Sequence, residues 1–194
     1  VNTRGLNFIP VIPASSSGTV TDLTALNAGV GEIDPNSVVT GVSQTSRDQF
    51  SFSYNLALQA DPNRKWGGEI ISFNDTNRLN LSSGALTFEV AGTPKILISV
   101  SDDVQVGTNL DGSPQYRSVN LLYSGITGAN RFVNITAAAL LQANPNFHPA
   151  QISSVSFIVD PSIGQASGTV TVNTRGLNFI PVIPASSSGT VTDL

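Results

Sequence analysis

The chain has no cysteine and no methionine, and only 11% of its 194 residues are charged. Without cysteine it can form no disulfide, no thiolate metal site and no cysteine nucleophile. The charged fraction is well below the roughly 25% of typical globular proteins. A net charge of −4 argues against a nucleic-acid partner, because binding phosphates requires clustered lysines and arginines. No apolar run reaches the roughly 18 residues of a membrane-spanning helix, so no membrane span is expected.

Serine, threonine, asparagine and glycine take the place of charges, and apolar residues recur at every second position. Phe50, Phe52 and Tyr54 alternate with serines, which predicts a long, half-buried strand over residues 50–58. The same alternation predicts further strands at 69–73, 86–90, 96–100, 116–123, 132–135, 155–159 and 170–172. One short helix is expected at 136–143, with Thr136 as its N-cap. The pattern predicts an all-β sandwich of two antiparallel sheets.

Residues 1–23 recur unchanged as residues 172–194, so that Val1 returns as Val172. A period of this length is that of a whole domain, which indicates beads on a string rather than a solenoid of short repeats. We therefore interpret the chain as a piece of a longer tandem polymer. The expected divisions are the end of a preceding repeat at 1–13, a linker at 14–18, the domain at 19–183, and a linker with the start of the next repeat at 184–194.

The two copies of the repeated segment predict contacts between repeats. The C-terminal copy continues from the predicted last strand, with a β-bulge expected at Arg175-Gly176. The N-terminal copy lacks that lead-in, yet it carries apolar side chains that are expected to pack on a neighbouring repeat or molecule by strand addition. The residues expected at this assembly contact are Leu6, Phe8, Ile9, Val11 and Ile12, together with Leu177 and Phe179.

From Ala85 onward the order of features resembles jelly-roll carbohydrate-binding modules and their galactose-binding-domain-like relatives. The segments that carry the resemblance are 86–92 with 95–101, then 131–136 with the short helix, and finally 152–160 with 168–172. The resemblance implies a jelly-roll fold of the kind found in extracellular bacterial or archaeal proteins. In those modules the last strand often carries a central aspartate, whereas this chain has Thr171-Val172-Asn173-Thr174.

Sugar binding requires exposed aromatic rings that stack on pyranose faces, and polar side chains that reach the hydroxyl groups. Trp66 is the only tryptophan and lies beside a predicted turn, and Tyr116 with Arg117 could assist it. The alternative for Trp66 is that it covers the hydrophobic core at a sheet edge. The lone His148 lies in a loop and is expected to be solvated.

Calcium is the only cofactor that the sequence raises, because hard cations take several oxygen ligands from loops. The resemblance to jelly-roll modules, which often hold a calcium ion between their first and last strands, implies Glu32, Asp34 and Asp160 as ligands. Asp102 and Asp103 are open to interpretation either as oxygen ligands or as turn residues.

No catalytic activity is expected. The three glutamates Glu32, Glu69 and Glu89 show no spacing that selects a glycosidase pair, and no Ser-His-Asp arrangement surrounds the single histidine. The sequence favours a structural repeat of an extracellular fibre, stalk, adhesin or surface layer, whose partners are copies of itself. The alternative is a carbohydrate-binding module of a modular secreted protein, with a polysaccharide as its partner.

Overall fold

The structure of the chain is a computed structural model that describes residues 29–32, 38–46, 49–73, 78–82, 85–109, 112–126 and 131–173. The strands in this part of the chain are β1 (Gly29–Glu32), β2 (Val39–Ser46), β3 (Gln49–Asn55), β4 (Gly67–Ser72), β5 (Ala85–Ala91), β6 (Lys95–Thr108), β7 (Pro114–Ser124), β8 (Arg131–Thr136), β9 (Ser154–Val159) and β10 (Ser167–Asn173). The helical elements are η1 (Leu56–Leu58), η2 (Pro62–Arg64), α1 (Ala137–Ala143) and η3 (Pro161–Ile163).

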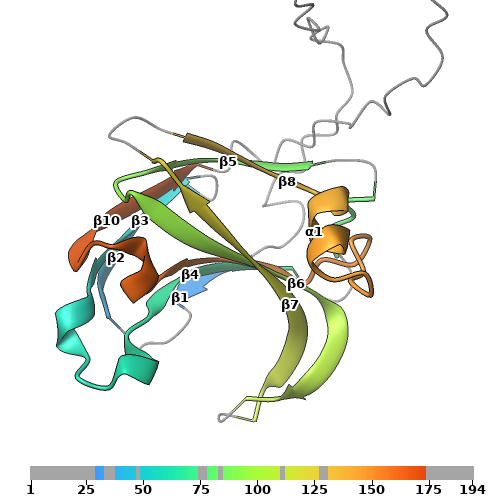
Figure 1. Ribbon diagram of the computed structural model, residues 1–194, viewed down its shortest axis with the longest axis horizontal. Coiled ribbons are helices and arrows are strands. Elements are labelled where there is room, and N and C mark those ends of the chain that lie inside the picture. The colour runs from blue at the N-terminus through green and yellow to red at the C-terminus, as the bar shows by residue number, and fades with distance from the viewer. Residues whose placement is uncertain are drawn as a thin grey trace, which may run out of the picture.

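Ten strands form two five-stranded sheets that pack face to face (Figure 1). Sheet A has the order β1-β4-β9-β6-β7 and sheet B the order β2-β3-β10-β5-β8. Every recorded pair is antiparallel, and successive strands often lie in different sheets. The protein is therefore an all-β jelly-roll sandwich with one short α-helix in the described part of the chain, which confirms the predicted fold class.

The core fills the space between the two sheets, as the alternation of apolar residues requires. Phe50, Phe52 and Tyr54 of β3 all point inward and are almost completely buried. Phe157 of sheet A meets two rings of sheet B edge-on, with centroid distances of 5.6 Å to Phe50 and 5.0 Å to Phe88. Edge-to-face pairs of this kind add to the stabilisation that burial alone provides.

The short helix lies where it was expected. Thr136 is its N-cap, and the Thr136 hydroxyl accepts a hydrogen bond from the backbone N–H of Ala139 at 3.1 Å. Leu140 is fully buried, and α1 covers one end of the sandwich (Figure 1). Among the described residues no helix is long and apolar enough to cross a membrane.

Several strand boundaries differ from those expected. β3 ends at Asn55, because the Asn55 side chain caps η1 by accepting a hydrogen bond from the backbone N–H of Ala57. The edge strands β1 and β2 were not expected at all. The expected domain boundaries, the Arg175-Gly176 bulge and all seven residues of the expected assembly contact lie outside the described residues. Of the repeated C-terminal segment, Val172 and Asn173 of β10 are described.

The largest difference is in β6, which runs on to Thr108 instead of ending near residue 100. Its pairing with β9 ends at Ser101, so from that point only β7 accompanies it. We call this two-stranded extension, residues 103–108 and 114–117, the arm. Figure 1 shows the β6–β7 hairpin curving out of the sandwich on the side of sheet A.

Candidate functional site

The outer face of sheet A is lined by serines and aliphatic side chains. The strand registers place three rows across β4, β9, β6 and β7. These rows are Ser72–Ser154–Ser101–Ser118, Ile70–Ser156–Ser99–Asn120 and Gly68–Ile158–Leu97–Leu122. Their neighbours along each strand, such as Ile71, Phe157 and Val100, point into the core. Along the direction of the strands, the face therefore changes from a row of serines to a row of glycine and aliphatic residues.

The serine row is suited to a ligand that carries many hydroxyl groups. Ser72 and Ser118 are exposed, and Ser101 is half-buried. Neighbouring strands lie about 4.8 Å apart, so the row repeats a hydroxyl at that interval. Ser154 is buried, whereas the hydroxyl groups of the other three serines make no hydrogen bond within the described residues and are available to a ligand.

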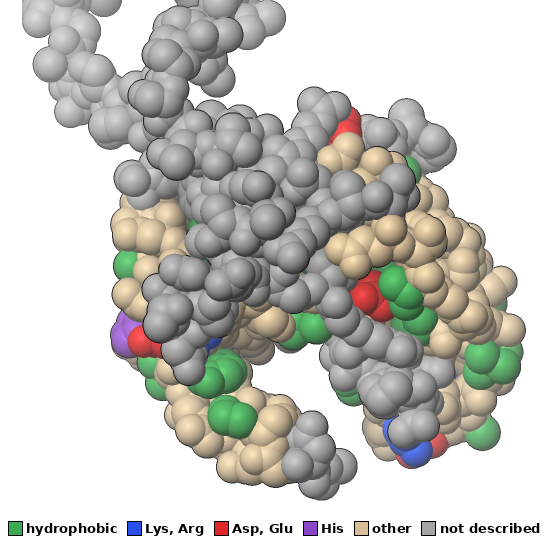
Figure 2. Space-filling view, turned by 180° about the vertical axis from the view of Figure 1, so that it is seen from behind, with side chains coloured by type: hydrophobic (Ala, Val, Ile, Leu, Met, Phe, Trp, Pro, Cys, Tyr) green, Lys and Arg blue, Asp and Glu red, His purple; other side chains and the backbone are tan. Residues whose placement is uncertain are grey.

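This face lies at the base of a hollow in the molecule. Figure 2 shows the surface hollowed between the β6–β7 arm and the opposite end of the domain, where η1 and η2 lie. The two aromatic residues expected at a sugar site come from these opposite sides. Tyr116 belongs to the arm, and Trp66 directly precedes β4 at the end of the η1–η2 segment. The structure thus places them at two separate edges of the hollow rather than together.

Tyr116 is held on the arm by a cation–π contact. The guanidinium carbon of Arg78 lies 5.4 Å from the centre of the Tyr116 ring. Along β7, Tyr116 is in phase with Ser118 and Asn120 of the outer face, whereas Val119 points into the core. Its ring is only half-buried, so part of it remains accessible from the hollow.

Trp66 is also half-buried and is fixed by one hydrogen bond. Its indole N–H donates to the backbone carbonyl of Asn63 at 3.1 Å. The turn that carries it is itself capped, because the Asp61 carboxylate accepts a hydrogen bond from the backbone N–H of Asn63 at 2.9 Å. The indole is therefore tied to the turn that precedes β4 and does not belong to the buried core.

Arg117, expected beside Tyr116 as a sugar ligand, points the other way. Its guanidinium donates to Oδ2 of Asp102 through Nε at 2.8 Å and through a second, shorter contact from Nη2. Asp102 is fully buried in β6, and the Arg117 side chain is only 16% exposed. The ring of Phe147 lies 6.0 Å from the Arg117 guanidinium carbon. This arginine therefore belongs to the inside of the fold.

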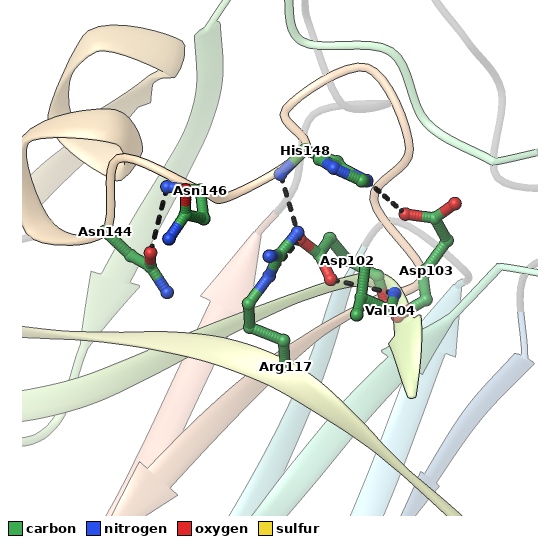
Figure 3. Close-up of polar contacts among 8 residues, drawn as sticks. Asp102, Asp103, Val104, Arg117, Asn144, Asn146 and His148 are labelled. Carbon is green, nitrogen blue, oxygen red and sulfur yellow. Dashed lines mark hydrogen bonds and ion pairs between the residues drawn. The ribbon is translucent and has the colours of Figure 1, made fainter. Parts of the chain in front are cut away.

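Asp102 joins three segments of the chain, as Figure 3 shows. Besides Arg117 of β7, its carboxylate accepts hydrogen bonds from the backbone N–H groups of Val104 at 3.0 Å and His148 at 2.9 Å. Its own backbone carbonyl accepts a hydrogen bond from the Ser153 hydroxyl at 2.7 Å. Asp102 is thus neither a turn residue nor a free oxygen ligand, because both carboxylate oxygens already hold the protein together. Neither the composition nor the alternation of residues predicts this role.

Asp102, Asp103 and His148 bring three potential metal-ligating atoms within 4.8 Å of one another. His148 Nδ1 lies 3.0 Å from the carboxylate of Asp103, and both residues are exposed, so this contact forms a surface pair. The guanidinium of Arg117 already neutralises the charge of Asp102. These contacts favour a structural role for the cluster, and His148 is paired rather than simply solvated.

The expected calcium ligands cannot be compared with one another in the structure. Asp34 lies outside the described residues, and only the backbone of Glu32 is described, in β1 opposite Glu69. Asp160 caps η3, where its Oδ1 accepts a hydrogen bond from the backbone N–H of Ser162 at 2.8 Å. The calcium site therefore stays a prediction.

No protein-family profile matches the sequence, and no curated protein matches it. Solved structures similar to the chain include carbohydrate-binding modules. A family 30 module is 17% identical, with a TM-score of 0.48 over 76% of this chain and 88% of that one. The family 11 module from Clostridium thermocellum, in complex with a β-1,3-1,4-mixed-linked tetrasaccharide, is 12% identical, with a TM-score of 0.47 over 77% and 86% of the two chains. A CBM29-2 mutant complexed with cellulohexaose is 12% identical, with a TM-score of 0.40 over 76% and 88%.

Proposed function

We propose that this domain is a non-catalytic module that binds a polysaccharide over the outer face of sheet A. The observation that carries the proposal is the outer face of sheet A, which lies beside the hollow seen in Figure 2. This face carries the exposed hydroxyl-bearing side chains of Ser72 and Ser118, and the half-buried rings of Tyr116 and Trp66 come from β7 and from the residue directly before β4. Sugar rings present apolar faces and polar edges, so a face that combines both kinds of side chain is complementary to them.

The lack of charged side chains in the three rows of this face is suited to a neutral or weakly charged ligand. The three rows contain only serine, asparagine, glycine and aliphatic residues, so no charged side chain interrupts them. A polysaccharide running diagonally across the strands would cross all three rows, with Tyr116 two residues beyond Ser118 in β7 at one end and Trp66 two residues before Gly68 of β4 at the other. Tyr116 and Trp66 are the proposed stacking residues, and Arg117 takes no part in direct contact.

Affinity electrophoresis against a panel of soluble plant, algal and microbial polysaccharides tests this function. The wild-type domain is expected to be retarded by at least one of them. Tyr116→Ala and Trp66→Ala should each weaken that retardation, and Ser51→Ala on the outer face of sheet B should not. Because Trp66 is the only tryptophan, the same polysaccharide should also change its fluorescence. Retardation that persists in both aromatic variants would contradict the assignment of the site.

A second function rests on the identity of residues 1–23 and 172–194. We propose that the domain is repeated in tandem in an extracellular or surface protein and that the repeated segments mediate contacts between copies. In support, β10 already includes the first two residues of the C-terminal copy, and Val172 is fully buried in the core. The domain therefore runs directly into the repeated segment. β10 ends at Asn173, which corresponds to Asn2, and β1 begins at Gly29. The segment that joins β10 of one copy to β1 of the next would therefore correspond to residues 3–28.

Deletion of residues 1–13 tests the second function. The shortened chain should fold with an unchanged melting temperature, because the C-terminal copy already supplies Val172 and Asn173 to β10 of sheet B. Its end-to-end association, measured by sedimentation velocity over a range of concentrations, should be weakened or lost. A shortened chain that associates like the full one, or that fails to fold, would contradict this interpretation.

A further inference from the structure

The arm leaves sheet A at a single point. Up to Ser101, β6 is paired on both sides, with Ser154 of β9 and Ser118 of β7. After Ser101 the pairing with β9 has ended, and the next recorded pair with β7 is Gln105 with Tyr116. Three residues of β6 therefore lie opposite one residue of β7, which is a bulge that bends the strand. Asp102 is the first residue of this bulge.

A two-stranded ribbon has little stability of its own in water, so the direction of the arm must be set at its base. Asp102 forms hydrogen bonds to three parts of the chain at the base of the arm. Its carboxylate holds Arg117 on the partner strand, the Val104 N–H inside the bulge and the His148 N–H of the loop after α1. The loop is in turn anchored by Phe147, which is 2% exposed.

The same contacts fix the proposed stacking residue. Arg117 and Tyr116 are neighbours in β7 and project from opposite faces of the strand. With the Arg117 guanidinium held by Asp102 on the inner side, Tyr116 is presented on the outer side, where Arg78 lies over its ring. A change in the angle of the arm would carry Tyr116 away from the serine row.

We propose that Asp102 and Arg117 are positioning residues that set the angle of the arm and thereby the place of Tyr116 at the edge of the hollow. Neither residue touches the ligand. The consequence for polysaccharide binding rests on the proposed function, whereas the control of the arm angle does not depend on it.

The absence of cysteine allows a direct test by spin labelling. Labels at Thr108→Cys in the arm and Ala60→Cys near η2 report the distance between the arm and the body of the domain by pulsed electron paramagnetic resonance. A second pair, at Ala60→Cys and Ser167→Cys in β10, lies within the body and serves as the internal control. Both pairs are placed in wild type, Asp102→Asn, Arg117→Gln and the matched control Asp103→Asn. The control removes the neighbouring exposed carboxylate but leaves the Asp102 contacts.

The wild type and Asp103→Asn should give one narrow arm-to-body distance. Asp102→Asn and Arg117→Gln should lose that narrow peak, whereas the pair within the body stays narrow. A folded Asp102→Asn domain with an unchanged arm-to-body distance would overturn the proposal. If Asp102→Asn does not fold, Arg117→Gln decides by the same criterion, since it removes the charged donor and leaves the buried acceptor.

Affinity electrophoresis separates this proposal from the proposed function. With whichever polysaccharide retards the wild type, Arg117→Gln should bind roughly tenfold more weakly, comparable to the loss of one anchoring contact, and Asp103→Asn should bind normally. If no polysaccharide retards the wild type, the proposed function fails, and the distance measurements still decide whether Asp102 and Arg117 set the arm. Normal binding by a variant with a displaced arm would remove Tyr116 from the binding site.

Discussion

Gly68 of β4 lies directly against the backbone of Phe157 in the neighbouring strand β9. A Cβ atom on Gly68 would lie 1.9 Å from the carbonyl oxygen of Phe157, far inside any permitted contact. Gly68 also has φ of +154°, in the region where residues with side chains are strained. Close approach and backbone conformation together require glycine at this position of sheet A, at the β4 end of the apolar row on its outer face.

Gly68→Ala should therefore lower the free energy of unfolding by about 2–3 kcal/mol, as expected for a strained backbone position that cannot accept a side chain. Gly41→Ala is the matched control, because a Cβ at Gly41 meets nothing within 4 Å. Urea denaturation followed by tryptophan fluorescence measures both. Equal stability of the two variants would show that β4 can shift away from β9.

Tyr54 should make the domain sensitive to alkali. Burial raises the pKa of its phenol above the ordinary value of 10.0, and the nearby Thr93 side chain offsets part of that rise. Below pH 10 the phenol is neutral in both the folded and unfolded states. As the pH rises above 10, the unfolded chain ionises first, so the stability falls until the folded pKa is passed.

The expected slope for this one group is about 1.4 kcal/mol of unfolding free energy per pH unit. Tyr54→Phe should lack this component, so the difference in unfolding free energy between wild type and variant should move in favour of the variant between pH 9 and pH 11. Denaturation at a series of pH values measures the difference. Parallel curves over that range would contradict the raised pKa of Tyr54.

The N-cap of α1 offers a local test of stability. Thr136→Ala removes the hydroxyl that accepts from the Ala139 N–H, and should cost about 1 kcal/mol. Thr136→Ser keeps the hydroxyl and should lose only a small fraction of that amount. Thermal unfolding by circular dichroism distinguishes the two variants. A serine variant as unstable as the alanine variant would show that packing of the methyl group matters more than the cap.

Calcium binding can be tested without knowing the full ligand set. If Glu32, Asp34 and Asp160 hold an ion, an excess of chelator should lower the melting temperature by several degrees, because an ion that binds only the folded state stabilises it. Asp34→Asn should abolish this response, and Asp103→Asn, which alters a different cluster, should not. An unchanged melting temperature in excess chelator would rule out the calcium site.

Much of the sandwich could be predicted because its central strands carry their own pattern. Phe50, Phe52 and Tyr54 alternate with serines, and all three are buried in the structure as that alternation requires. β2 was missed because it lies at an edge and has few large side chains, and its Val42 is 48% exposed. Its pairing with β3 determines its conformation, and no alternation of large apolar residues within β2 predicts that pairing.

The candidate site was only partly accessible to sequence reasoning. Trp66 and Tyr116 were chosen because sugar binding requires aromatic rings, and the structure places each at an edge of the hollow. The ion pair of Asp102 with Arg117 depends on the register of two strands and on a bulge between them, which composition and alternation do not specify. The serine row is equally a product of register, since its four members come from four different strands.

The strand order has a consequence for how the chain is completed during synthesis. β9 lies between β4 and β6 in sheet A, and β10 lies between β3 and β5 in sheet B. Until the ribosome has released these last two strands, each sheet exists only as two separate pairs with an open gap at its centre. Both halves of the sandwich are then closed by residues 154–173, so a nascent chain halted before Ser154 exposes four unpaired inner strand edges.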